Sequence, residues 1–172
     1  MTTIIAVRHG KPSGPEVTTE EQNRVGEAVR DFAARAWISL AWAHILAGST
    51  PRAMQTGLGI AKVNDIPDIA TSMDVPADSK IFSSYPSRDQ IPWISSQPVN
   101  ALIDLIRAKA AEIAPKQLIV VGNVPSLWAL WARLDPDKFP PFVYTQESAG
   151  TAEDMMRYWE PFLLDLDADT NW

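Results

Sequence analysis

Basic and polar side chains come directly after three short apolar segments of this sequence. An arginine presents planar, bidentate donors that suit a phosphate-like anion, and a helix N-terminus adds free N–H groups and a positive dipole. Arg52 comes two residues after Thr50, a hydroxyl N-cap candidate, so both effects coincide there. We therefore expect an anion site, with Arg8, His9, Arg52 and Asn123 as its candidate residues.

These residues can meet only if the apolar segments are neighbouring strands of one sheet. The segments 4–7 (IIAV) and 118–121 (LIVV) are short and apolar throughout, as expected for strands that are buried on both faces of a parallel sheet. Ligands of such sheets bind beyond the carboxyl ends of the strands, where all three polar segments would converge. The predicted strands cover 4–7, 42–48, 117–121 and part of 67–75.

The predicted strands are separated by segments in which apolar residues recur at helical spacing. Prolines and serines recur over 76–98 and predict a long loop, 136–141 predicts another, and 152–166 fits either a helix or an edge strand. The alternation of strands and helices predicts an α/β sandwich with a largely parallel sheet. The predicted helices cover 19–36, 51–63, 98–114 and 125–134.

Composition limits the class of protein. The chain of 172 residues is 46% apolar and 21% charged, which predicts one folded domain over 1–172. Its net charge of −6 argues against nucleic acid as a partner, and no apolar run approaches the ~20 residues that span a membrane. With no cysteine and no recognisable metal or nucleotide motif, we expect a cytoplasmic protein that needs neither a cofactor nor a metal.

The motifs around the candidate residues resemble the histidine phosphatase (phosphoglycerate mutase-like) superfamily. Arg8-His9-Gly10 follows the first predicted strand, and Ser49-Thr50-Pro51-Arg52-Ala53-Met54-Gln55-Thr56 supplies the second arginine motif. A late strand followed by a Gly-X-X-Pro turn, at 122–125, completes the pattern. The short length is most similar to the compact SixA-type branch. This resemblance implies a three-layer sandwich with helices on both faces of the sheet.

The resemblance also implies roles for the residues. His9 would attack phosphorus and form a phosphohistidine intermediate, while Arg8 and Arg52 hold the phosphoryl oxygens. An acid after the second helix would protonate the leaving group. Asp78 is the preferred candidate, because it lies in the predicted loop, and Asp74 or no acid at all are the alternatives. His44 has no motif around it and is expected to pack on the second strand.

Asn123 departs from the family pattern, which has a second histidine at this position. Its amide still donates to a phosphoryl oxygen, but it carries no charge. Loss of one donor aimed at the transition state typically costs about 10²–10³ in rate, so Asn123 predicts a weakened enzyme or a non-catalytic protein. Asparagine before a helix is also a common turn residue.

Three functions therefore stay open. The first is a phosphatase that acts on a phosphomonoester or a phosphohistidine, its partner being a small phosphorylated substrate or a phosphohistidine protein. The second is a non-catalytic phosphate- or phospholigand-binding pseudophosphatase. A phosphomutase or another transferase is the third. The intact set of Arg8, His9 and Arg52 favours the first, and Asn123 favours the second.

Overall fold

A five-stranded sheet forms the centre of the protein. The computed structural model describes residues 2–71, 97–135 and 158–168. The strands lie in the order β3-β2-β4-β1-β5, and all adjacent pairs are parallel except β1 and β5. The predicted, largely parallel α/β sheet is thus confirmed. The strands are β1 (Thr3–Arg8), β2 (His44–Ala47), β3 (Asp68–Thr71), β4 (Leu118–Gly122) and β5 (Phe162–Asp165).

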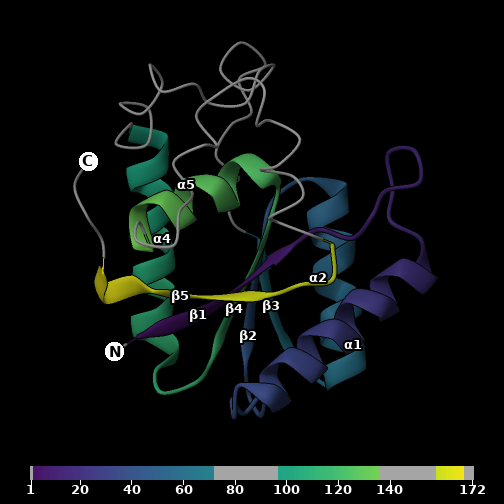
Figure 1. The fold of residues 1–172 in the computed structure, drawn as a ribbon, viewed down its shortest axis with the longest axis horizontal. Helices are drawn as coiled ribbons and strands as arrows, with labels where there is room; N and C mark the ends of the chain where they lie inside the picture. Colours follow the sequence, from purple (N-terminus) through teal and green to yellow (C-terminus); the bar gives the residue numbers. More distant parts are fainter. Residues whose placement is uncertain (1, 72–96, 136–157, 169–172) are drawn as a thin grey trace.

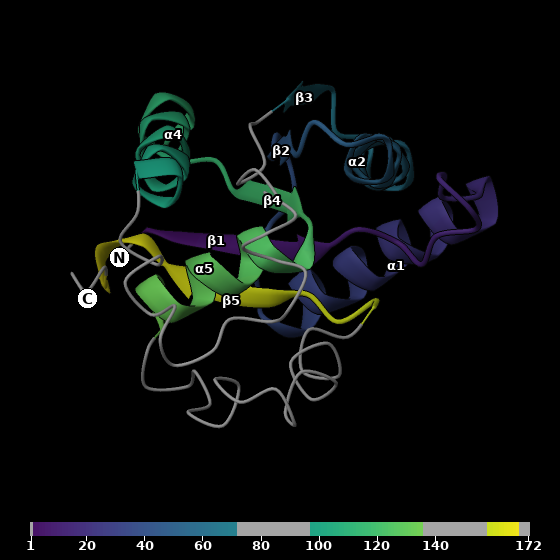
Figure 2. The ribbon, with the colours of Figure 1, turned by 90° about the horizontal axis from the view of Figure 1, so that it is seen from above.

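Helices cover both faces of the sheet (Figures 1 and 2). Successive residues of a strand point to opposite faces, so the apolar runs of β1, β2 and β4 supply two separate cores. Ile4 and Ala6 pack in one core with α4 and α5, whereas Ile5 and Val7 pack in the other with α1 and α2. This arrangement confirms the three-layer sandwich. The helices are α1 (Thr19–Arg35), α2 (Pro51–Asn64), α4 (Gln97–Ile113) and α5 (Val124–Leu134), and a 3-10 turn, η4 (Leu166–Ala168), follows β5.

Side-chain caps fix where helices α1 and α2 begin. The Thr18 hydroxyl accepts a hydrogen bond from the Glu21 N–H at the start of α1. Thr50 caps α2 in the same way, with Pro51 at the first helical position. Each cap satisfies a backbone donor that the helix itself leaves open. Both helix starts were predicted, and the predicted ends of 36 and 63 differ by one residue from those observed.

Helices α1 and α2 cross at very short distance because glycines lie at the contact. A Cβ added to Gly59 would come within 2.6 Å of the Gln22 Cβ and carbonyl oxygen. One added to Gly26 would come within 2.8 Å of Val63 and 2.9 Å of the Gly59 carbonyl oxygen. The two backbones therefore approach as closely as only glycine allows.

The connection from α1 to β2 exposes two tryptophans and corrects the predicted start of that strand. The prediction began β2 at residue 42, but Trp42 lies in a turn with φ of 62°, 70% exposed, and the strand begins at His44. Trp37 lies two residues after the end of α1, has a φ of 57° and is 95% exposed. Its N–H donates to the Ala34 carbonyl, and the Ile38 N–H donates to the Ala33 carbonyl. This pattern of bonds is the Schellman helix end, at which glycine usually occupies the left-handed position.

The remaining predictions for the fold fall partly outside the described residues. Within 67–75, β3 covers four residues, and within 152–166 the edge-strand alternative is confirmed by β5. Helices α4 and α5 each begin one residue before the predicted start. The predicted loops over 76–98 and 136–141 lie almost entirely outside the described residues.

Candidate functional site

The three polar segments lie side by side at one edge of the sheet. Strand β1 ends at Arg8, and the next residue, His9, donates its backbone N–H to the Gly122 carbonyl at the end of β4 (3.1 Å). The Gly48 N–H, just after β2, donates to the Val121 carbonyl (2.8 Å). The carboxyl ends of β2, β4 and β1 are therefore adjacent, as the sequence predicts. In open α/β sheets this edge is where ligands bind.

A hydrogen-bond relay joins the end of β1 to the first turn of α2. The Gly10 N–H donates to the Thr56 hydroxyl (2.9 Å), which in turn donates to the Arg52 carbonyl (2.7 Å). Gly10 has no room for a side chain, since an added Cβ would lie 2.8 Å from Val17 Cγ1. The relay and the tight packing at Gly10 fix the backbone of His9 relative to the helix that carries Arg52.

The His9 imidazole is held in one tautomer. Its Nδ1 lies 2.9 Å from the Gly10 carbonyl oxygen, and a carbonyl only accepts, so Nδ1 carries the hydrogen. In the neutral ring, Nε2 then holds the lone pair. Burial lowers the pKa of His9 below 6.5, the Gly10 carbonyl opposes this shift, and the positive charges of Arg8 and Arg52 lower the pKa further. His9 is therefore neutral at pH 7, with a nucleophilic Nε2.

Two arginines approach this histidine from different elements. Arg8 is 9% exposed at the end of β1, and Arg52 is half-buried in the first turn of α2. The Arg52 Nη2 donates to the carbonyl of Gly14 (3.2 Å), in the connection between β1 and α1. Two cations beside a neutral imidazole, next to the N-terminus of α2, form a surface that suits an anion.

Asn123 caps helix α5 at the same edge. Its Oδ1 accepts a hydrogen bond from the Ser126 N–H (2.9 Å), so the side-chain oxygen is directed toward the helix. The carboxamide NH2 is the donor that this arrangement leaves for a ligand. The sequence predicts Asn123 as a turn residue before a helix, and the structure shows that it is the N-cap of that helix. Phosphate contact by its amide stays a prediction.

Tyr158 is a neighbour of this site that the sequence analysis missed. The Arg8 Nη2 donates to its hydroxyl (2.9 Å), and the Arg8 guanidinium carbon lies 3.8 Å from the centre of its ring. The His9 and Tyr158 ring centres are 6.3 Å apart. Tyr158 lies 150 residues from Arg8 along the chain, and no local motif marks it. The pairing of β5 with β1 brings this part of the chain back to the end of β1.

Other predicted residues lie elsewhere. Asp78 and Asp74, the candidate acids, lie outside the described residues. His44 begins β2 and is half-buried, as expected of a packing residue.

Within the described ranges, no cluster of three or more histidine, aspartate or glutamate residues is arranged to hold a metal ion. None of the described helices has the length and apolarity that crossing a membrane requires.

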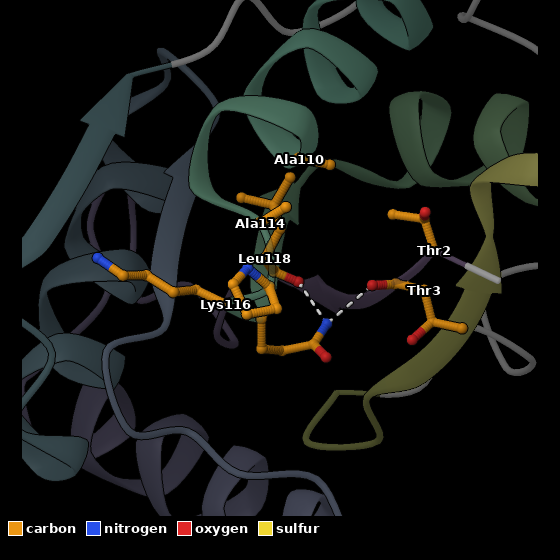
Figure 3. A pocket seen from close by; sticks show the side chains of 8 residues that line it. Thr2, Thr3, Ala110, Ala114, Lys116 and Leu118 are labelled. Carbon is orange, nitrogen blue, oxygen red and sulfur yellow. Dashed lines mark hydrogen bonds between the residues drawn. The ribbon is translucent and has the colours of Figure 1, made fainter.

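A separate cavity of about 310 Å³ opens at the opposite end of the sheet (Figure 3). It lies between the C-terminal end of α4 and the first residues of β1 and β4, with Ala110, Ala114, Thr3 and Leu118 in its wall. The Gln117 amide crosses it and donates to the Thr3 and Leu118 carbonyls (3.0 Å each). The side chains of Arg8, His9 and Arg52 take no part in this cavity.

Comparison with known proteins gave only loose similarities. No protein-family model matches the sequence, and no curated protein was found to be related to it. Among solved structures, the chain is similar to one assigned as the phosphohistidine phosphatase SixA from Agrobacterium tumefaciens, with 14% identity, 83% of this chain and 81% of that chain covered, and a TM-score of 0.46. It is also similar to mycobacterial hydrolase 1, with 13% identity, 76% of this chain and 79% of that chain covered, and a TM-score of 0.49. A third similarity is to the mycobacterial glucosyl-3-phosphoglycerate phosphatase, solved with VO3. The identity is 13%, 77% of this chain and 79% of that chain are covered, and the TM-score is 0.48.

Proposed function

We propose that this protein is a phosphatase that hydrolyses a phosphomonoester or a phosphohistidine through a phosphohistidine intermediate on His9. The observation that supports this proposal most strongly is the state of His9, which is 7% exposed. Its Nδ1 carries the hydrogen that bonds to the Gly10 carbonyl, and its lowered pKa keeps the ring neutral. A histidine nucleophile needs a free Nε2 lone pair, and this environment supplies it without a separate base.

The chemistry proceeds in two displacements. In the first, Nε2 of His9 attacks phosphorus, the bond from phosphorus to the leaving oxygen or nitrogen breaks, and the leaving group takes up a proton. In the second, water attacks the phosphorus of the phosphohistidine, the P–N bond breaks, and inorganic phosphate departs. Arg8 and Arg52 would stabilise the phosphoryl oxygens through both steps. Asp78 stays the preferred donor of the proton, with Asp74 or no acid as the alternatives.

The substrate is a small phosphorylated molecule or a phosphohistidine protein. Two arginines and a helix N-terminus recognise the phosphoryl group itself, which both substrates share. Neither a cofactor nor a metal is required by a mechanism that uses a nitrogen nucleophile and arginine donors. We place the reaction in the cytoplasm.

A non-catalytic phospholigand-binding protein is the second candidate, and the cap at Asn123 favours it. With Oδ1 committed to the Ser126 N–H, the side chain offers a neutral donor where a cationic histidine would add charge stabilisation. Binding needs only the two arginines, whereas turnover also needs stabilisation of the transition state.

A comparison of two histidine variants tests the proposal. The chain has two histidines, and His9→Ala should abolish hydrolysis of aryl phosphates and phosphoamidates, because the covalent step has no substitute. His44→Ala is the matched control and should keep turnover near the wild-type rate. Equal loss in both folded variants would exclude His9 as the specific nucleophile. Phosphate binding without any turnover in the wild type would favour the second candidate.

A further inference from the structure

The aromatic ring that covers Arg8 belongs to a firmly anchored corner of the chain, here called the 158–159 corner. Tyr158 contacts Arg8 in two ways, as a hydrogen-bond acceptor through its hydroxyl and as a π-surface through its ring. A guanidinium stacked on a ring directs its N–H groups sideways, in its own plane, so the stacking contact restrains the orientation of Arg8.

Trp159 anchors this corner to helix α1. Its indole Nε1 donates to Glu21 Oε1, and the Arg24 guanidinium carbon lies 3.4 Å from the centre of its ring. The Tyr158 and Trp159 ring centres are 6.0 Å apart. Three residues after Trp159 the chain enters β5, where Phe162 pairs with Ala6 of β1. Tyr158 is therefore held from both sides, by α1 and by the sheet.

Anchoring of Tyr158 lowers the entropy that Arg8 loses when it binds a ligand. A mobile arginine side chain loses rotamer entropy when it is ordered, and ligand binding must supply that free energy if the protein does not. Among the described residues, Arg8 and Arg52 are the cations that act on His9, and Asn123 is neutral with its oxygen capping α5. The orientation of each guanidinium therefore contributes strongly to anion affinity.

We propose that Tyr158 is a positioning residue, which holds the Arg8 guanidinium in the orientation that binds an anion. It does so through the hydrogen bond to its hydroxyl and the contact with its ring, and the proposal rests on the phosphate site proposed above. The tyrosine thus compensates in part for the missing cationic histidine at residue 123, because a preorganised arginine binds an anion more tightly than a mobile one. The effect on the ligand passes through Arg8.

Inorganic phosphate is the probe, and its dissociation constant is measured by calorimetric titration of the full chain. Tyr158→Phe keeps the ring and removes the hydroxyl, and should weaken phosphate binding about 5-fold, the scale of one typical hydrogen bond. Tyr158→Ala removes both contacts and should weaken it further. Phe162→Leu, in the adjacent strand, is the control: it should lower the melting temperature and leave the dissociation constant unchanged.

The Arg8→Ala background distinguishes positioning from direct contact. There, Tyr158→Phe should change the dissociation constant less than twofold, because the residue that Tyr158 orients is gone. An equal loss in both backgrounds, or a Tyr158→Phe variant within twofold of wild type, would overturn the positioning role. Absence of phosphate binding by the wild type is a different result, which would overturn the proposed function itself.

Discussion

Replacement of Asn123 by aspartate distinguishes a residue that only starts a helix from one that also faces a phosphoryl group. Aspartate has almost the same shape, and its carboxylate oxygen can accept the Ser126 N–H that Asn123 Oδ1 accepts at 2.9 Å. Aspartate and asparagine are about equally good N-caps, and a negative charge at a helix N-terminus is favourable by about 0.3–1 kcal/mol. The ligand-free stability of Asn123→Asp should therefore equal or exceed that of the wild type.

Phosphate binding should respond in the opposite direction. Two unit charges about 5 Å apart at an effective dielectric constant of about 20 repel by about 3 kcal/mol, which corresponds to about 10²-fold in affinity. Because Asn123 is half-buried, solvent screens part of this repulsion, and we expect a loss of about 10- to 10²-fold. The variant also loses the amide donor.

The assay pairs thermal denaturation without ligand with titration by inorganic phosphate. Asn123→Ala is the companion variant: loss of its cap should cost about 1 kcal/mol, or about 2–4 °C in melting temperature, with a smaller loss of phosphate affinity than in the aspartate variant. If Asn123→Asp binds phosphate as tightly as the wild type at low salt, Asn123 serves only as the cap of α5. A destabilised aspartate variant would instead refute the capping geometry.

Four further outcomes are expected. Asn123→His should raise kcat about 10²-fold by adding a donor that can be cationic, and a slower variant would show that asparagine is adapted to this site. In an NMR titration, His9 should protonate with a pKa below 6.5, and added phosphate should raise this pKa; a pKa above 6.5 without ligand would contradict the burial argument. Since the folded state favours neutral His9, its contribution to stability is present above pH 6.5 and is lost as the pH falls toward its folded pKa. Trp37→Gly should stabilise the fold by about 0.5–1 kcal/mol, measured by urea denaturation, because its side chain is exposed at a left-handed position; destabilisation would mean that the indole packs in solution.

The order of elements and the edge that carries the site are properties that the sequence determines by itself. Short apolar runs without polar interruption are typical of strands that are buried on both faces, and hydroxyl caps mark the starts of α1 and α2. Parallel strands have their carboxyl ends at one edge, so local patterns were sufficient to predict that the segments before His9, Arg52 and Asn123 end side by side. The exception is the start of β2, where the apolar pattern continues through Trp42 although its backbone turns.

Contacts between distant segments were decided only by the tertiary structure. Tyr158 reaches Arg8 because β5 pairs antiparallel with β1, and nothing near either residue in sequence encodes that pairing. Gly59 permits the close crossing of α1 and α2, a requirement that appears only when the second helix is in place. The lowered pKa of His9 likewise depends on burial by the assembled elements and on an arginine from another helix. Local sequence fixes propensity and spacing, whereas the electrostatics of the site depend on distances through space between residues far apart in the chain.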